Sequence, residues 1–103
     1  HNQTALYYCS REGHIEAMRR LLDASPPGEI NHRDCNGQTA LYYAAKTEQL
    51  EACVCLVEEY GCDPCAVDSF GATARSCAPA KSEVEQYLKR AESGILTSVV
   101  FYQ

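Results

Sequence analysis

Long apolar segments, basic clusters and targeting signals are scarce in this sequence, and each absence excludes a class of protein. No apolar run approaches the roughly 18 residues that a membrane-spanning helix needs, so we expect no membrane partner. Nine Lys and Arg residues stand against 14 Asp and Glu residues, which gives a net charge of −5. Nucleic-acid binders need clustered basic residues. The one short basic cluster, Arg19–Arg20, is better explained as a solvated helix face, so we expect no nucleic-acid partner.

The start of the chain and its cysteines indicate where the protein is found. The sequence begins at His1 and has no signal-peptide pattern, and we expect a monomeric fragment of a longer protein. Its seven cysteines are an odd number, whereas a disulfide framework favours an even number at regular spacing. Free thiols indicate a reducing compartment. We therefore expect an intracellular protein, cytoplasmic or nuclear, in which the acceptor-like sequence at residues 2–4 carries no glycan.

Motifs for catalysis and phosphate binding are missing as well. No Ser or Cys stands at a known motif spacing from a His, and there is no glycine-rich phosphate loop. We therefore expect no enzyme, no catalytic residues, no cofactor and no small-molecule substrate.

The strongest feature that is present is an internal repeat. The sequence QTALYY occurs at residues 3–8 and again at residues 38–43. Thr4 and Thr39 are 35 residues apart, Thr39 and Thr73 are 34 residues apart, and a less regular third copy follows from residue 71. A period of this length predicts a stack of repeated units that bury their apolar faces against one another.

Each unit can be assigned local structure from its residue pattern. Asp34 and Gly37 have the spacing of a tight turn, in which Asp accepts backbone hydrogen bonds and Gly takes a positive φ. We expect Thr39 to cap a short helix over 39–46 through its hydroxyl. Apolar residues then recur on one face of a second helix over 48–59, which a glycine ends. The predicted fold class is therefore all-α.

This arrangement resembles the ankyrin-repeat family, whose motif reads roughly Asp-x-x-Gly-x-Thr-Pro-Leu-His-x-Ala-Ala, followed by Gly-His-Leu-Glu. The second unit matches the family pattern at Asp34, Gly37, Thr39, Leu41, Ala44, Ala45, Leu50, Glu51, Gly61 and Asp63. The first unit matches it at Thr4, Leu6, Gly13, His14, Ile15, Glu16, Leu21, Leu22 and Asn31. The resemblance implies a solenoid of helix-turn-helix units joined by β-hairpin-like loops, with repeats at 1–33, 34–67 and 68–90.

The third unit departs from this pattern. Arg75 replaces the core Leu of the motif, and Pro79 lies where the short helix would continue, so we expect that helix to end near Ala78. The apolar tail over 91–103 lies beyond the repeats. We expect the tail to cover the open end of the last repeat, and the alternative makes it the start of a further repeat or a docking strand.

Paired tyrosines mark the first two units, where Tyr7 and Tyr42 stand in place of the motif's His. In the family that His helps to tie adjacent hairpins together, so the resemblance implies that a tyrosine hydroxyl remakes the tie or that the tie is lost. Neighbouring helix residues diverge by about 100 degrees. We expect Tyr8 to stack on Tyr43 between units, and the alternative places Tyr7 and Tyr42 on an aromatic binding surface.

Four cysteines between residues 53 and 65 raise the question of a metal site. The Cys-x-x-Cys spacing of Cys62 and Cys65 is found in zinc knuckles. However, Cys53 and Cys55 diverge by about 200 degrees in a helix, and a free cysteine packs well as a small apolar residue. We expect structural thiols and no metal, with a metal- or redox-responsive element as the alternative.

The resemblance predicts a protein-interaction module, a scaffold or adaptor for a protein or peptide partner. In the family, partners lie on the concave face, which is made of hairpin tips and the inner edge of the short helices. Carried across by register, the expected partner-binding residues are Arg11, Glu12, Cys35, Asn36, Gln38, Lys46, Thr47, Ser69, Phe70 and Ala72. Phe70 is the expected apolar anchor, unless it packs locally against Tyr60 or Val67. The rival function is a structural spacer within a larger solenoid.

The assigned register leads to a prediction about stability. Leu41→Ala should lower the free energy of unfolding by roughly 2–5 kcal/mol, because it leaves a cavity in the core of the middle unit. Arg75→Leu should cost little or even stabilise the third unit. Thermal melts measure both changes, and a neutral Leu41→Ala would show that the register is wrong.

Overall fold

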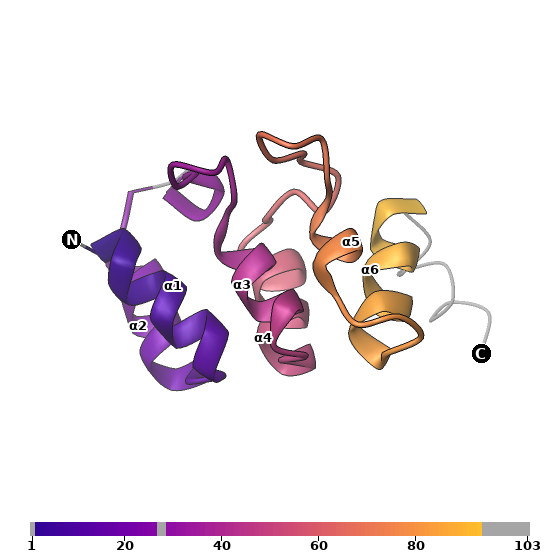
Figure 1. The fold of residues 1–103 in the computed structure, drawn as a ribbon. Coiled ribbons are helices and arrows are strands. Elements are labelled where there is room, and N and C mark those ends of the chain that lie inside the picture. Colours follow the sequence, from indigo (N-terminus) through magenta and orange to yellow (C-terminus); the bar gives the residue numbers. More distant parts are fainter. Residues whose placement is uncertain (1, 27–28, 94–103) are drawn as a thin grey trace.

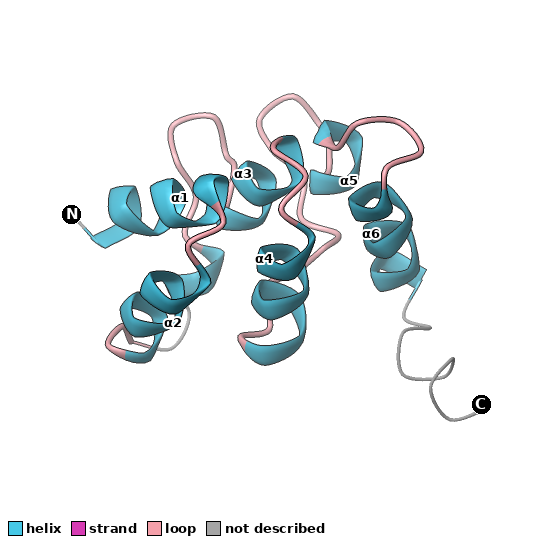
Figure 2. Cartoon of the chain, turned by 90° about the horizontal axis from the view of Figure 1, so that it is seen from below, coloured by secondary structure: helices cyan, strands magenta, loops and turns pink. Residues whose placement is uncertain are grey.

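The structure, a computed structural model, describes residues 2–26 and 29–93, and its helices form two rows. Within these residues the elements are, in chain order, α1 Asn2–Glu12, α2 Ile15–Asp23, the 3-10 turn η1 Glu29–Asn31, α3 Ala40–Lys46, α4 Leu50–Val54, the π-helical segment η2 Cys55–Glu59, α5 Ala74–Cys77 and α6 Glu83–Ser93. Figure 2 shows α1, α3 and α5 in one row and α2, α4 and α6 in the other. None of the described residues forms a strand, and the all-α prediction is confirmed.

Each helix of the first row is followed by its partner in the second row, which gives three stacked units. The units contact one another through α1 with α3 and α3 with α5 (Figure 1). Helix α6 continues to Ser93, past the predicted boundary at residue 90, and the predicted cap lies outside the described residues from residue 94 onward. A shared core between the rows includes the fully buried side chains of Met18, Leu41, Leu56 and Leu88.

Two tight turns, one before α3 and one before α5, project from the same side of the helices (Figure 1). In the first turn, Asp34 Oδ1 accepts hydrogen bonds from the backbone amides of Asn36 and Gln38 at 2.8 and 3.0 Å. Gly37 in this turn has a φ of 76°. The second turn repeats the arrangement around Asp68, whose Oδ1 accepts two amide hydrogen bonds at 2.8 and 2.9 Å. The predicted Asp-x-x-Gly turns are therefore confirmed.

The side chain of Tyr42 connects the second turn to the core. It is only 1% exposed, and its hydroxyl is hydrogen-bonded to the carbonyl oxygens of Ala66 and, at 2.8 Å, of Ala72. These two residues lie on opposite sides of the turn, so one hydroxyl holds both. Burial raises the pKa of Tyr42 to about 12, so the hydroxyl stays protonated at neutral pH. Tyr42 therefore remakes the tie between hairpins and does not lie on a binding surface.

The predicted stack of Tyr8 on Tyr43 is wrong. Tyr43 instead stacks on Tyr7, with ring centroids 4.9 Å apart and the rings inclined by 27°. Tyr8 is 51% exposed and lies beside His14. Since Tyr7 and Tyr8 diverge around α1, only one of them can face α3.

The predicted start of the second helix at residue 48 is also wrong. Glu48 has a φ of 58°, which is the left-handed region, and α4 begins at Leu50. Gly13 holds the corresponding place in the first unit with a φ of 75°. The repeat thus keeps a positive φ between its helices even where Glu replaces Gly, at a cost that glycine avoids.

The predictions for the ends of the short helices are confirmed only in part. Thr39 precedes α3, but its hydroxyl makes no capping hydrogen bond and instead lies 3.8 Å from Cys62 Sγ, so the predicted cap is wrong. Thr39 is 1% exposed, and its hydroxyl is directed toward this buried thiol of the same unit rather than toward the free amides of α3. Helix α5 ends at Cys77, and Ala78 takes an extended backbone before Pro79, as predicted.

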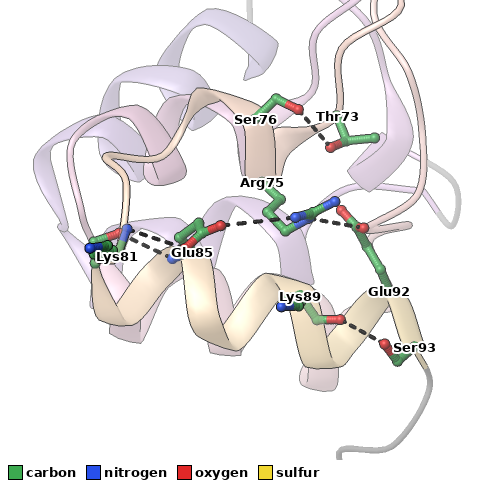
Figure 3. Close-up of polar contacts among 9 residues, drawn as sticks. Thr73, Arg75, Ser76, Lys81, Glu85, Lys89, Glu92 and Ser93 are labelled. Atoms are coloured by element: carbon green, nitrogen blue, oxygen red, sulfur yellow. Dashed lines mark hydrogen bonds and ion pairs between the residues drawn. The ribbon is translucent and has the colours of Figure 1, made fainter.

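Arg75 joins α5 to α6 through an ion-pair network (Figure 3). Its Nε lies 3.1 Å from Glu92 Oε1, and its Nη1 lies 3.9 Å from Glu85 Oε2. The Glu92 side chain is 19% exposed, and its Oε2 is buried without a hydrogen-bond partner among the described residues. Arg75 therefore balances a largely buried carboxylate rather than merely interrupting an apolar core.

We expect Tyr42→Phe to lower the free energy of unfolding by about 1–3 kcal/mol, because two partly buried carbonyl groups each lose a donor while the ring stays in place, although the Ala72 carbonyl keeps the Asp68 amide. Tyr8→Phe is the matched control, since Tyr8 is half exposed, and it should change stability by less than about 0.5 kcal/mol. Urea unfolding followed by circular dichroism measures both. Equal stabilities of the two variants would contradict the role given to the Tyr42 hydroxyl.

The network revises the prediction for Arg75→Leu, which we now expect to destabilise the protein by about 1–3 kcal/mol, because it leaves the Glu92 carboxylate without its counter-charge. Adding Glu92→Leu to this variant should restore much of the loss, since both charges are then absent. Arg20→Leu serves as a control because the Arg20 side chain is 83% exposed. The same unfolding assay measures these variants. If Arg75→Leu is neutral or stabilising, the network contributes little and the expectation from the sequence is correct.

Candidate functional site

The predicted partner-binding residues lie in two exposed groups. The first group lies on the two turns and consists of Cys35, Asn36, Ser69 and Phe70. The second group lies where α1 and α3 end and consists of Arg11, Glu12, Lys46 and Thr47. Two more predicted residues, Gln38 and Ala72, are not exposed.

The two turns pack directly against each other. The backbone amide of Ser69 donates a hydrogen bond to the carbonyl oxygen of Asn36 at 2.9 Å. A side chain at Gly37 would place its Cβ only 2.8 Å from the Ser69 nitrogen, so glycine is needed there for space as well as for its positive φ. Each turn therefore supports the other, and their exposed tips are held in one arrangement.

Gln38 is part of this support rather than of the exposed surface. It is 7% exposed, its Nε2 donates to Asp68 Oδ2 at 3.0 Å, and its Oε1 accepts from Lys46 Nζ at 2.6 Å. Ala72 likewise uses its amide and its carbonyl inside the second turn. Both residues therefore lie beneath the exposed surface of the turns.

Two exposed residues that the sequence analysis missed lie beside the turns. Arg33 Nη1 donates to the carbonyl oxygen of Val67 and, at 3.4 Å, to that of Gly37. Val67 itself is 48% exposed. Each of the two directly precedes the Asp of a turn, and they are 34 residues apart, so they hold equivalent positions in two repeats. We call the following exposed residues the turn face: Arg33, Cys35, Asn36, Val67, Ser69 and Phe70.

Phe70 is the most exposed large apolar residue among those described, at 80%. It does not pack on Tyr60 or Val67 to any large extent. Its backbone amide donates to Asp68 Oδ1 at 2.8 Å, so the main chain is held while the ring is free to contact another molecule.

The carboxylates under the turn face already have their hydrogen-bond donors. Burial opposes the ionisation of Asp34, but the Tyr43 hydroxyl and two backbone amides outweigh it and keep the pKa of Asp34 below its usual value. The Gln38 side-chain amide, followed by backbone amides, lowers the pKa of Asp68. Both groups are therefore ionised at neutral pH and are bound internally.

The group at the helix ends is held by polar contacts between α1 and the end of α3. Thr47 Oγ1 donates to the carbonyl oxygen of Arg11 at 2.7 Å, and Gln49 Nε2 donates to the same oxygen at 3.2 Å. The Arg11 guanidinium is paired with Glu12 at 3.1 Å. The charge of Lys46 is directed toward the turns, because its ammonium contacts Gln38 and lies 5.1 Å from the centre of the Tyr43 ring.

The cysteines that suggested a metal or redox site differ in their exposure to solvent. Cys53, Cys55 and Cys62 are buried, whereas Cys65 is exposed. Burial raises the pKa of Cys53 to about 12 and that of Cys62 to about 11, so both stay as thiols, which are poor nucleophiles and ligands. The part of the chain that the structure describes contains no group of three or more His, Cys, Asp or Glu residues that could hold a metal ion.

A protein-family model described as ankyrin repeats (3 copies) matches residues 1–68, which contain α1 to η2 and the first turn. No curated protein matches the chain. No helix among the described residues combines the length and the apolar character needed to cross a membrane.

Proposed function

Because this chain belongs to the ankyrin-repeat family, whose members are generally protein–protein interaction modules, we propose that it binds a protein or peptide partner on the turn face. The family is typically non-enzymatic, in keeping with a scaffold or adaptor role. The single observation that carries the proposal is Phe70, an 80% exposed aromatic side chain on a turn whose backbone is fixed.

A fixed turn favours binding because ordering a flexible loop would cost part of the interaction energy. Here the second turn is held at Tyr42, at Asp68 and at Asn36 of the neighbouring turn. An exposed aromatic ring at its tip can supply a large apolar contact with few degrees of freedom to lose. The polar residues around it, Asn36 and Ser69, suit the rim of such a contact.

The group at the ends of α1 and α3 extends the proposed surface. Thr47 and Arg11 bring the exposed ends of two neighbouring short helices together. A larger partner could contact both the turns and the ends of α1 and α3. A short peptide would contact the turns alone. The partner that we propose is intracellular, as the free thiols indicate.

Lys46 is a poor residue for testing this proposal. Its ammonium contacts Gln38, and it contributes to the lowered pKa values of Asp34 and Asp68. Lys46→Glu would place a further carboxylate beside these two and disturb the turns themselves. Phe70 is the better choice because truncating an exposed ring leaves the hydrogen bonds of the turn intact.

We expect Phe70→Ala to weaken partner capture at least about tenfold, as the loss of a binding anchor does. Immobilised full-length chain is incubated with cell extract, and retained proteins are identified and quantified by mass spectrometry. Glu51→Lys, an exposed change on α4 in the other row of helices, is the control and should retain the same partners as the unchanged chain. Circular dichroism melts should be equal for all three proteins.

Two results would contradict the proposed function. Retention of the same partners by Phe70→Ala, together with their loss from Glu51→Lys, would move the binding surface to the second row of helices. A chain that retains no protein above a blank support would favour the spacer role instead.

A further inference from the structure

The two carboxylates under the turn face have their donors within the chain, whereas the nearby cations Arg33 and Lys46 have no carboxylate partner among the described residues. Asp34 and Asp68 already accept hydrogen bonds on both oxygens: each accepts two backbone amides, and the Tyr43 hydroxyl and the Gln38 amide supply the third donor of the two sets. An incoming ligand therefore finds few free acceptor sites on these two carboxylates. A donor-rich ligand, such as a lysine-rich peptide, would gain little from these two carboxylates.

The cations on the same side are bonded to neutral groups. Arg33 donates to two backbone carbonyls, and Lys46 contacts an amide oxygen and an aromatic ring. Neither forms an ion pair with a carboxylate among the residues that the structure describes. Arg11, Arg19 and Arg75, by contrast, each have a carboxylate partner at 3.1 Å or less. Arg33 keeps donors available, since a guanidinium has five and the structure uses one nitrogen.

Apolar surface lies directly beside this cation. Arg33 is bonded to the main chain of Val67, whose side chain is 48% exposed, and Phe70 follows three residues later on the same turn. The turn face thus combines a carboxylate-binding group with two apolar side chains on a backbone that is already fixed.

We propose that the turn face recognises an acidic peptide segment in which a carboxylate side chain lies within a few residues of a large apolar side chain. The carboxylate is bound by Arg33, with support from the positive charge of Lys46, and the apolar side chain contacts Val67 and Phe70. This inference rests on the proposed function, which concerns where a partner binds, and adds which partner is selected.

A second copy of this chain is a less suitable occupant. With a net charge of −5, two copies repel each other over most of their surfaces. A short acidic peptide brings its charge only to the cations of the turn face. Sedimentation equilibrium of the free chain shows whether a second copy occupies the turn face.

Short random peptides displayed on phage are selected on the immobilised full-length chain, and enriched peptides are synthesised with a fluorescent label. Fluorescence anisotropy then gives their dissociation constants. We expect enriched peptides to carry Asp or Glu near Phe, Tyr, Leu or Ile. Arg33→Gln should weaken their binding roughly two- to fivefold, as the loss of a partly exposed ion pair does, and Arg33→Lys should restore part of it.

The matched control is Arg20→Gln, which removes an arginine whose side chain is 83% exposed on α2, and it should leave binding unchanged. Replacing the acidic residue of a binding peptide by Lys should weaken binding to the unchanged chain more than to Arg33→Gln. This coupling separates direct contact from a general effect of Arg33 on the turns. Melting curves of both Arg33 variants confirm that the chain remains folded.

Each other result overturns the inference in a distinguishable way. Selected peptides that lack Asp and Glu but lose affinity for Phe70→Ala contradict the acidic partner class. They remain consistent with the proposed function. Peptides that bind Phe70→Ala and Arg33→Gln as tightly as they bind the unchanged chain contradict both proposals. A selection that yields no peptide contradicts the partner class alone, because the proposed function also allows a folded protein partner. Dimerisation of the free chain in sedimentation equilibrium, lost in Phe70→Ala, identifies a second copy as the occupant instead.

Discussion

The hydroxyl of Tyr42 is the point at which the core of the middle unit and the second turn are joined. The ring is buried in α3, while the oxygen bonds Ala66 and Ala72 on the two sides of the turn. Asp68 then organises the backbone between them, and Gln38 connects that carboxylate to the preceding turn. The position of Phe70 therefore depends on packing that lies several residues away in the interior, which is how a loop without strands can present a fixed surface.

The third unit solves the same packing problem with charge. Where the second unit has Leu41 at 0% exposure, the third has Arg75 paired with Glu92 and Glu85 (Figure 3). Such a network holds α5, a helix shortened before Pro79, against the longer α6. A partly buried ion pair adds little net stability compared with a well-packed apolar pair, but removing one partner is costly. The last unit therefore depends on these ion pairs, and removal of either charge should destabilise it.

The sequence predicted the repeated architecture well, because the period and the turn residues are local signals. Thr4, Thr39 and Thr73 gave the register, and the Asp34 and Asp68 turns formed as expected. Choices between adjacent residues were less predictable. Tyr7 rather than Tyr8 faces Tyr43, since helix rotation, and not residue type, decides which ring meets the next unit.

The candidate site was predicted less completely for a related reason. Exposure at a turn depends on which side chains its neighbours use for support, and Gln38 was placed on the surface although two neighbours, Asp68 and Lys46, hold it inside. Arg33 and Val67 were missed because the family motif does not specify the residue before the turn Asp. Their importance follows only from a side chain of one unit meeting the main chain of the next. Contacts of that kind have no signature within a single repeat.

Support and recognition are nevertheless divided between different residues of the same turns. Asp34, Gln38, Asp68 and Tyr42 use their polar groups internally, whereas the side chains of Asn36, Val67, Ser69 and Phe70 point outward with only their main chain involved in the fold. Outward side chains can therefore change without altering the turn, so the partner preference of one repeat chain says little about that of another. Arg33 stands between the two classes, because its guanidinium supports the backbone of Val67 and still presents free donors. Selection for a new partner would change Phe70 or Asn36 at little cost in stability, while a change at Arg33 would alter both the charge of the surface and the support of the turn beneath it.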